Sequence, residues 1–218
     1  MNKKEYIESK TFLFFELQNE MEEYAKEKHI PIISRDSLDF LIGILKIKKP
    51  KSVLEFGTAI AYSAIAMAVN LPEDAKIITL ERDLQRVEEA NAYIERMGLQ
   101  DKIEVHAVDA TAADELIRNN RFDFVFIDAA KGQYRLFFDM VYDSVSEGGI
   151  LLSDNVFYKE MVLADDASQV DKRYRTIYRR MNEYLSFLKT KNEEFFTTLV
   201  PIGDGIAVTY KNERNMNE

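Results

Sequence analysis

Two apolar segments of the chain end abruptly in residues that can do chemistry. "FVFIDAAKGQY", residues 124–134, runs into Asp128 and reaches Lys131 three residues later, and "GILLSDN" ends on Asp154 and Asn155. If the two segments are neighbouring parallel strands, their carboxyl ends lie about 5 Å apart. Carboxylate and amide oxygens at that spacing suit a hard divalent cation. Asp128, Asp154 and Asn155 therefore predict a metal site, with Mg²⁺ preferred and Mn²⁺ or Ca²⁺ as alternatives.

A second interpretation of these residues needs no metal. Asp128 would be the N-cap of a helix that begins near Ala129, and Asp154 with Asn155 would form an ordinary turn. Two carboxylates that converge without a cation repel each other, which favours the metal. Lys131 can reach the same pocket because it lies one helical step beyond Asp128. A solvated lysine at the start of a helix is its alternative.

The rest of the chain supplies elements that can position these residues. Strand and helix patterns alternate, which is typical of an α/β fold with a parallel sheet. Five strands are expected, over residues 52–57, 75–82, 102–110, 122–128 and 148–155. Helices are expected over 62–71 and 83–97, and two or three helices within 2–48. Segments 195–203 and 205–211 are joined so tightly that they must form an antiparallel hairpin.

Polar residues recur at the carboxyl ends of the strands, where open α/β sheets bind their ligands. Gly57 allows a tight turn and a close approach of a ligand to the backbone, and Ser63 lies near the start of the next helix. Glu81 ends the second strand, where its carboxylate can accept both hydroxyls of a ribose. The third strand ends at Asp109 and Ala110. Capping of the following helices is the alternative role for the two acids.

The stretch that begins at Gly57 departs from the dinucleotide fingerprint G-x-G-x-x-G. It reads G-T-A-I-A-Y, so two of the three glycines are missing. Glu55 adds negative charge where a pyrophosphate would be repelled and a cationic ligand attracted. S-adenosylmethionine carries a sulfonium and an ammonium group and no phosphate. The sequence therefore predicts a site for S-adenosylmethionine.

Bulk composition is that of one acidic domain without cysteine chemistry. The 218 residues carry a formal net charge of −9, are 46% hydrophobic and include no cysteine, which excludes disulfides and a thiolate nucleophile. No apolar run approaches the roughly 20 residues of a membrane span, and the N-terminus lacks the apolar stretch of a signal peptide. We expect a cytoplasmic protein without a membrane partner. Its single domain, 1–218, would comprise a helical cap, 1–48, and a sheet core that binds the cofactor, 49–218.

Basic residues gather in the last third of this acidic chain. A helix is expected from about residue 171 to 189, with an apolar stripe along one side. The basic residues would form a phosphate-binding ridge for RNA: Lys159, Lys172, Arg173, Arg175, Arg179 and Arg180. A solvated amphipathic helix with extended arginines is the alternative, and nearby acids could neutralise much of the ridge.

Taken together, these segments resemble the class I S-adenosylmethionine-dependent O-methyltransferases of the metal-dependent, catechol and caffeoyl-CoA type. The similar segments are "LEFGTAIAYSA", "TLER", "VDA", "FIDAAKGQY", "LLSDNV" and "PIGDGIAV". The resemblance implies a Rossmann-like α/β fold with a mostly parallel seven-stranded sheet, a C-terminal antiparallel hairpin and N-terminal helices. It also implies a homodimer. "FLFF" at 12–15 would pack across the subunit interface or, equally, inside one chain.

The resemblance also assigns roles to residues. The cofactor site would be lined by Ile33, Glu55, Gly57, Ser63, Glu81, Asp109, Ala110 and Asp128. Asp128, Asp154 and Asn155 would hold the metal. Asp128 and Lys131 would be catalytic, with Lys131 either taking the proton of the reacting hydroxyl or stabilising its oxyanion. The family usually has glycine where this chain has Ala61, and the extra methyl group would narrow the loop over the cofactor.

The expected acceptor follows from the same resemblance. "KHIPII", "FIDAAKGQY" and "SDNVFYK" are similar to bacterial members of the family that methylate 5-hydroxyuridine in tRNA, which makes tRNA the expected partner. A 5-hydroxyuracil and a catechol share the two adjacent ring oxygens that can chelate a metal. Methylation of small catechol-like phenols is the alternative function. A third hypothesis is an RNA-binding module on an inactive methyltransferase fold.

Overall fold

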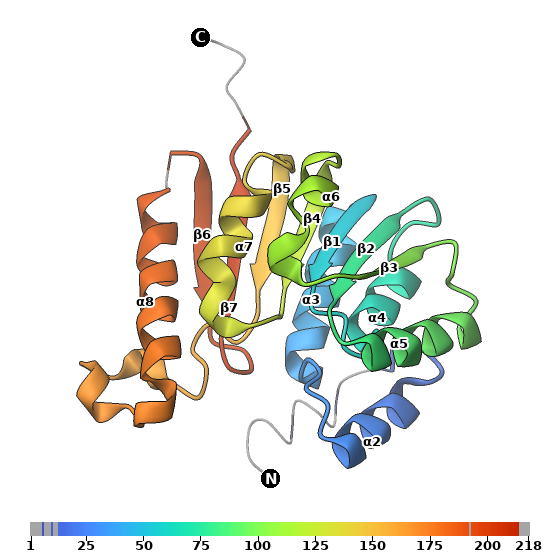
Figure 1. Cartoon of the computed structure of the whole chain (residues 1–218). Helices are drawn as coiled ribbons and strands as arrows, with labels where there is room; N and C mark the ends of the chain where they lie inside the picture. Colours follow the sequence, from blue (N-terminus) through green and yellow to red (C-terminus); the bar gives the residue numbers. More distant parts are fainter. Residues whose placement is uncertain (1–5, 7–9, 11–12, 192, 214–218) are drawn as a thin grey trace. The chain divides into compact units, whose positions relative to one another are not determined.

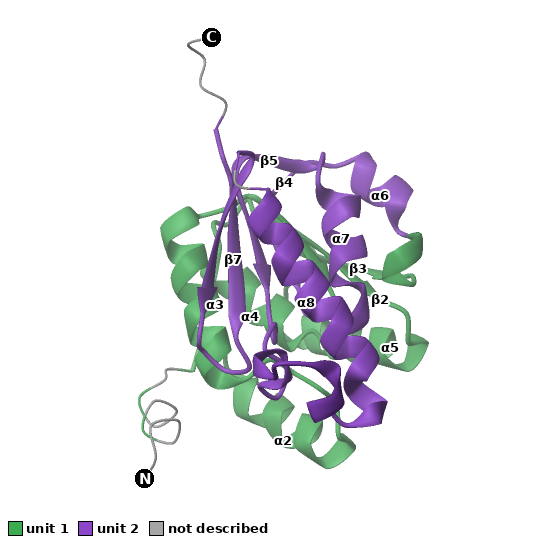
Figure 2. Ribbon diagram, turned by 90° about the vertical axis from the view of Figure 1, so that its left-hand side faces the viewer, with its two compact units in different colours: residues 1–112 green, residues 113–218 purple. Residues whose placement is uncertain are grey.

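A computed structural model of the chain describes residues 6, 10, 13–191 and 193–213 (Figure 1). The chain divides into two compact units, residues 1–112 and 113–218, which Figure 2 distinguishes by colour. Within the described part, no helix combines the length and apolarity that crossing a bilayer requires. Phe12 lies outside the described residues, whereas Phe15 is buried and packs edge-on against Tyr62 within the chain. The expectations of a dimer, of a single domain and of the cytoplasm stay predictions.

The first unit contains three parallel strands in the order β3-β2-β1. Its elements are α2 (Gln18–Lys28), α3 (Arg35–Lys48), β1 (Ser52–Phe56), α4 (Tyr62–Asn70), β2 (Lys76–Glu81), α5 (Leu84–Arg96), β3 (Ile103–Ala107) and the 3₁₀ turn η1 (Ala110–Ala112). Because Phe56 pairs with Leu80 and Glu81 with Ala107, the three strands end at one edge. That edge carries the polar residues of the predicted cofactor site.

Sequence pattern explains the helices of this unit. Residues 62–68 of α4 are all buried, and the helix is accordingly built from small and apolar residues. By contrast, α5 buries only Ala90, Tyr93 and Ile94 and exposes its charged side. Its N-cap is Asp83, whose carboxylate accepts hydrogen bonds from the backbone N–H groups of the first turn.

The second unit contains four strands in the order β4-β5-β7-β6, with β4 and β5 parallel and the other pairs antiparallel. Its strands are β4 (Phe122–Ile127), β5 (Val145–Ser153), β6 (Phe195–Val200) and β7 (Ile206–Lys211). Its α-helices are α6 (Asp114–Arg118), α7 (Tyr134–Val141) and α8 (Arg175–Thr190). Its 3₁₀ turns are η2 (Lys131–Gln133), η3 (Met161–Leu163), η4 (Ala167–Gln169) and η5 (Lys172–Tyr174). The hairpin at the C-terminal end is therefore confirmed.

Aromatic packing attaches the helices of this unit to its sheet. Phe138 of α7 meets Phe187 of α8 and Phe195 of β6, with ring centroids 5.2 Å apart in each pair. Tyr184 of α8 is fully buried, and its hydroxyl shares a 2.8 Å hydrogen bond with Ser153 at the end of β5. Since a buried hydroxyl is costly without a partner, this bond fixes α8 against the end of β5. Helix α8 runs beside β6 (Figure 1).

Most expected elements are found with shifted ends, and one is wrong in a way that matters for function. The expected helix 171–189 begins only at Arg175, because the Asp171 carboxylate accepts from the N–H of Arg173 and starts the separate turn η5. Lys172 and Arg173 therefore do not lie on α8. The expected apolar stripe comprises Ile177, Met181, Leu185 and Leu188. Helix α8 buries Met181 and Leu188 of these, together with Tyr184.

Candidate active site

Glu55 is the buried anion of the first unit. Its side chain is fully buried, Ser63 donates a 2.5 Å hydrogen bond to its Oε1, and Thr79 donates one of 2.5 Å to its Oε2. Hydrogen bonds of this kind offset the high cost of burying a carboxylate. The structure thus brings Glu55 and Ser63 together, as expected. Glu55 places negative charge beneath the loop that follows β1.

That loop, residues 57–61, contains an unusual density of left-handed backbone. Gly57, Ala59 and Ala61 have φ angles of 101°, 47° and 66°. The N–H groups of Gly57 and Thr58 both donate to the Leu80 carbonyl, at 3.1 and 3.2 Å. Ala61 is the N-cap of α4, makes no side-chain cap and is fully buried. Glycine would adopt this conformation without the steric cost that Ala61 meets.

Glu81 joins the ends of β1 and β2. Its Oε2 accepts from the N–H of Ala59 (2.9 Å), and its Oε1 accepts from those of Arg82 (2.9 Å) and Asp83 (3.0 Å). Capping of the next helix is therefore the wrong role for Glu81, because Asp83 caps α5. The carboxylate lies where the loop 57–61 meets the end of β2.

Asp109 does cap the turn that follows it. Its Oδ1 accepts from the N–H and the hydroxyl of Thr111, at 3.0 and 2.8 Å, over the turn that begins at Ala110. Arg82 lies 3.4 Å from its Oδ2. The hydrogen bonds from Thr111 and, more weakly, the Arg82 charge hold the pKa of Asp109 below its ordinary value. Asp109 can therefore cap this turn and still lie at the edge of the sheet that carries the predicted cofactor residues.

A network that the sequence did not reveal ties α2 and α3 to the start of α4. The Tyr62 hydroxyl, next to Ala61, donates to Glu22 at 2.5 Å, and Arg35 contacts the same carboxylate at 2.6 Å. Burial and the neighbouring Glu22 raise the pKa of Tyr62 well above its ordinary value, so the phenol stays protonated. Ile33, in the link between α2 and α3, is 5% exposed. The network attaches α2 and α3 beside the loop 57–61.

The predicted metal ligands meet in the second unit. The Asn155 amide nitrogen lies 2.9 Å from Asp154 Oδ2 and 3.4 Å from Asp128 Oδ1. Lys131 Nζ lies 3.4 Å from Asp128 Oδ1. Helix capping by Asp128 is wrong, because the helical turn begins at Lys131 with Ala130 at its N-cap. The structure therefore gathers the four residues at the ends of β4 and β5.

The electrostatics of this cluster fit a divalent cation. Asp154 is 2% exposed, and its pKa is raised to about 7 by burial and by the negative charge of Asp128. In the described part of the chain, no three or more His, Cys, Asp or Glu side chains form a metal-holding group, so a cation here would use Asn155 as well. The oxygen and the nitrogen of an Asn side-chain amide are distinguished only by their hydrogen-bond partners, so the amide can turn over when a cation replaces those partners. Turned over, Asn155 would offer an oxygen to a cation, and two carboxylates and an amide suit Mg²⁺.

Several of the predicted RNA-binding residues have partners within the chain, and the ridge stays a prediction. Arg173 pairs with Asp171 at 3.1 Å, Arg175 donates to the Val170 carbonyl, and Arg180 donates to the Gly132 carbonyl. Lys172 and Arg179 are exposed and make no hydrogen bond or ion pair with other described residues. Lys159 lies beside η5: its Nζ is 3.3 Å from the Tyr174 hydroxyl and 4.9 Å from the centre of the Tyr174 ring, which Arg173 also approaches, at 4.7 Å.

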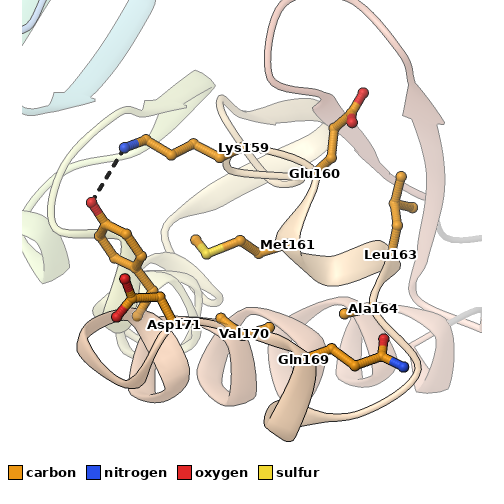
Figure 3. Close-up of a pocket in the computed structure, with 9 residues that line it drawn as sticks. Lys159, Glu160, Met161, Leu163, Ala164, Gln169, Val170 and Asp171 are labelled. Carbon is orange, nitrogen blue, oxygen red and sulfur yellow. Dashed lines mark hydrogen bonds between the residues drawn. The ribbon is translucent and has the colours of Figure 1, made fainter.

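Lys159 belongs to an open pocket of about 510 Å³ in the second unit (Figure 3). Figure 3 shows its side chain on one side of the hollow, across from Val170 and Asp171. The pocket is lined by Lys159, Glu160, Met161, Leu163, Ala164, Gln169, Val170, Asp171 and Tyr174. One lysine and two acids give this lining a mixed charge, so it is no dedicated phosphate site.

Comparison with known structures identifies the fold. A protein from Staphylococcus aureus assigned as a caffeoyl-CoA O-methyltransferase is 26% identical and superposes with a TM-score of 0.83, covering 91% of this chain and 93% of its own. An O-methyltransferase from Bacillus cereus, solved with S-adenosylhomocysteine, is 22% identical with a TM-score of 0.82, covering 96% of each chain. The mostly parallel seven-stranded, Rossmann-like methyltransferase fold with antiparallel C-terminal strands is thus confirmed.

Sequence comparison then identifies the family. The pattern of the O-methyltransferase family matches residues 5–212, so the chain belongs to that family. The caffeoyl-CoA O-methyltransferase of Medicago sativa is 28% identical over 185 residues, covering 83% of this chain and 74% of that protein. We accordingly place the chain among the S-adenosylmethionine-dependent O-methyltransferases.

Replacing Ala61 by glycine tests the strain in the cofactor loop. An L-residue in the left-handed region costs about 1–2 kcal/mol, and the greater unfolded-state entropy of glycine returns about 0.5–1 kcal/mol of that difference. Burial of the methyl group offsets about 0.8 kcal/mol of the remaining gain. We therefore expect Ala61→Gly to change the free energy of unfolding by no more than about 1 kcal/mol in either direction, with affinity for S-adenosylhomocysteine no lower. Urea unfolding and calorimetry would measure the two quantities.

Ala66→Gly is the matched control, because Ala66 is equally buried but lies in the interior of α4. It should destabilise the protein by about 1–2 kcal/mol through helix propensity and the lost methyl contact. Equal destabilisation by both substitutions would contradict the proposed strain at Ala61.

Proposed function

We propose that the protein uses a divalent metal, most simply Mg²⁺, to methylate a ring hydroxyl that lies next to a second ring oxygen, with S-adenosylmethionine as the donor. The observation that carries the proposal is the convergence of Asp128, Asp154 and Asn155 beside Lys131. Two adjacent oxygens of an acceptor can complete the coordination that three protein ligands leave open. When bound, the cation would act as a Lewis acid that stabilises the ionised hydroxyl.

The residues of the chain have separate tasks in this reaction. The acceptor hydroxyl gives its proton to solvent, or to Lys131 where the lysine acts as base. The oxygen then bonds the methyl carbon while the C–S bond of the donor breaks and leaves S-adenosylhomocysteine. Asp128, Asp154 and Asn155 fix where the acceptor oxygens bind, and alignment of two bound reactants lowers the barrier by several kcal/mol. Glu55, buried beneath the loop 57–61, favours a cationic donor there. Lys131 would meet the reacting oxygen.

Asp154→Asn tests the metal directly. In wild-type protein, Mg²⁺ at about 100 times its Kd should raise the free energy of unfolding by about 2.7 kcal/mol, because the ion binds only the folded state. The variant should lose this stabilisation and lose turnover by about a hundredfold or more, yet bind S-adenosylhomocysteine normally. Thermal unfolding with and without Mg²⁺, and calorimetry, give these quantities. Full activity of the variant, or of wild-type protein in excess chelator, would refute the metal mechanism.

Substitutions of Lys131 separate its two possible roles. Arginine keeps a positive charge but stays protonated, so it can stabilise an oxyanion and cannot accept a proton. The Lys131 ammonium lies beside Asp128, and we expect its charge to be the important property. Lys131→Ala should lower kcat by about a hundredfold, and Lys131→Arg should retain clearly more activity. A Lys131→Arg variant as inactive as Lys131→Ala would instead assign the lysine as the proton acceptor.

For the acceptor itself we propose 5-hydroxyuridine in tRNA, whose product would be 5-methoxyuridine. Support comes from the resemblance of "FIDAAKGQY" and "SDNVFYK" to tRNA-methylating relatives, and from the exposed cations Lys172 and Arg179, which are free to meet phosphates. Tyr158 follows Asn155 closely and offers an aromatic face to a flipped base.

Small catechol-like phenols are the second candidate acceptor. They present the same pair of adjacent oxygens, and the similar plant proteins are named for a phenolic thioester, caffeoyl-CoA. The pairing of Arg173 with Asp171, and of Arg175 and Arg180 with backbone carbonyls, also weakens the case for an RNA ridge.

Two assays distinguish the acceptors. With tRNA from cells that lack this protein, the tRNA hypothesis predicts that 5-methoxyuridine appears on incubation, as judged by nucleoside mass spectrometry, and that the rate falls steeply as salt rises. A Lys172→Glu, Arg179→Glu double variant should lose tRNA methylation and keep methylation of free catechol. Lys189→Glu, at the far end of α8, is the matched control. Unchanged 5-methoxyuridine in tRNA from such cells, together with salt-independent catechol turnover, would establish the phenol alternative.

A further inference from the structure

The segment that follows β5 has a backbone conformation that L-amino acids rarely adopt. Asn155, Tyr158, Lys159 and Glu160 have φ angles of 56°, 27°, 56° and 58°. Asparagine tolerates the left-handed region because its short side chain can hydrogen-bond locally. Tyrosine, lysine and glutamate lack that compensation. Strain of this kind persists only where the surrounding structure enforces it, and it concentrates at functional sites.

The turn between β6 and β7 holds the strained segment in place. The N–H of Val156 donates to the Gly205 carbonyl at 2.9 Å. The N–H of Phe157 donates to the Asp204 carbonyl at 2.7 Å, and the N–H of Lys159 donates to Asp204 Oδ2 at 3.3 Å. Asp204 therefore binds the segment through its main chain and through its side chain.

Gly205 lets the turn between β6 and β7 approach the Phe157 ring closely. Its φ angle is 84°, and a Cβ atom at this position would lie 2.3 Å from the Phe157 ring. The ring thus rests directly on the backbone of the turn, and a residue with a side chain could not take the place of Gly205 without moving it. Asp204 and Gly205 act on neighbouring parts of the same segment.

The segment carries residues for both the metal and the acceptor. Asn155 bonds to Asp154 at one end. At the other end, the Tyr158 ring lies 5.7 Å from Lys131 Nζ and edge-on to the Tyr174 ring at 6.0 Å. An aromatic surface therefore stands beside the lysine that would meet the reacting oxygen.

We propose that Asp204 is a positioning residue for the acceptor: by holding the segment 155–160, it keeps Asn155 at the metal ligands and Tyr158 alongside Lys131. The inference rests on the proposed function, since it takes the acceptor to be an aromatic ring. The acceptor ring packs against Tyr158 while its oxygens face the cluster.

Three variants of the full chain test the proposal. Asp204→Ala removes the side-chain acceptor, and Asp204→Asn keeps an oxygen that can accept from Lys159. Asp166→Ala is the matched control, because Asp166 is also an exposed aspartate that accepts a backbone N–H, from Ser168 at 2.5 Å, but its side chain makes no hydrogen bond to the described residues 155–160. The measurements are KM and kcat with free catechol and with S-adenosylmethionine, amide exchange of Phe157 and Lys159, and Mn²⁺ affinity by electron paramagnetic resonance.

Asp204→Ala should raise KM for catechol about tenfold and leave KM for S-adenosylmethionine within about twofold of wild type. The Lys159 amide should exchange faster and Mn²⁺ should bind more weakly. Asp204→Asn should recover most of each property, and Asp166→Ala should resemble wild type. Wild-type KM and exchange in Asp204→Ala would overturn the proposal, and so would an Asp204→Asn variant as impaired as Asp204→Ala.

Failure of the proposed function would look different. Wild-type protein would then methylate neither catechol nor 5-hydroxyuridine tRNA at any Mg²⁺ concentration. The Lys159 exchange rate and the Mn²⁺ affinity would still decide the role of Asp204. The exchange rate and the Mn²⁺ affinity should both change in Asp204→Ala and return toward wild-type values in Asp204→Asn. Unchanged values in Asp204→Ala would overturn the positioning role of Asp204.

Discussion

The close approach of two carboxylates at the ends of β4 and β5 is the constraint on which the rest of the site depends. Parallel pairing continues to Ile127 and Ser153, so Asp128 and Asp154 follow at neighbouring strand ends. The backbone is not free to separate them, because the N–H of Asp154 donates to the Ile127 carbonyl and its own carbonyl accepts from the buried Tyr134 hydroxyl. Mutual repulsion must therefore be met at the site itself, where Lys131 and the Asn155 amide lie within 3.4 Å of Asp128 and where the proposed cation would bind.

The same logic applies to Glu55 in the first unit, with a different solution. The hydroxyls of Ser63 and Thr79 donate to that carboxylate, and the Thr58 hydroxyl is bonded in turn to that of Thr79. Hydroxyl donors can hold a carboxylate in place without neutralising it. In the second unit, by contrast, carboxylates predominate over donors. A cationic organic donor suits the first arrangement and a divalent metal suits the second.

The sequence predicted the features that are local in the chain. Apolar runs that end in acids gave the strands and the residues at their ends, since one strand and its last residue are read from consecutive positions. It did not predict that Asp83 caps α5 while the neighbouring Glu81 bonds to Ala59, because two acids near a helix start look alike. The hydrogen bond between Tyr62 and Glu22 joins residues 40 positions apart, so no local sequence pattern predicts it. Likewise, the start of α8 at Arg175 depends on how Asp171 uses its carboxylate.

Backbone strain is the feature least visible in the sequence. His29 and Lys49 show positive φ angles at helix ends, but other such residues lie beside the predicted ligand sites. Ala59 and Ala61 in the first unit, and Tyr158 and Lys159 in the second, have positive φ angles without being glycine. Such residues cost about 1–2 kcal/mol each, so a chain selected for stability alone would carry glycine there. Side chains at these positions must therefore contribute something that glycine cannot. For Tyr158 and Lys159 the structure supplies a reason, since both side chains contribute to an aromatic and cationic cluster beside Lys131. For Ala61, whose methyl group is buried at the start of α4, the contribution is packing alone. Ala61 should therefore tolerate replacement by glycine better than Tyr158 or Lys159.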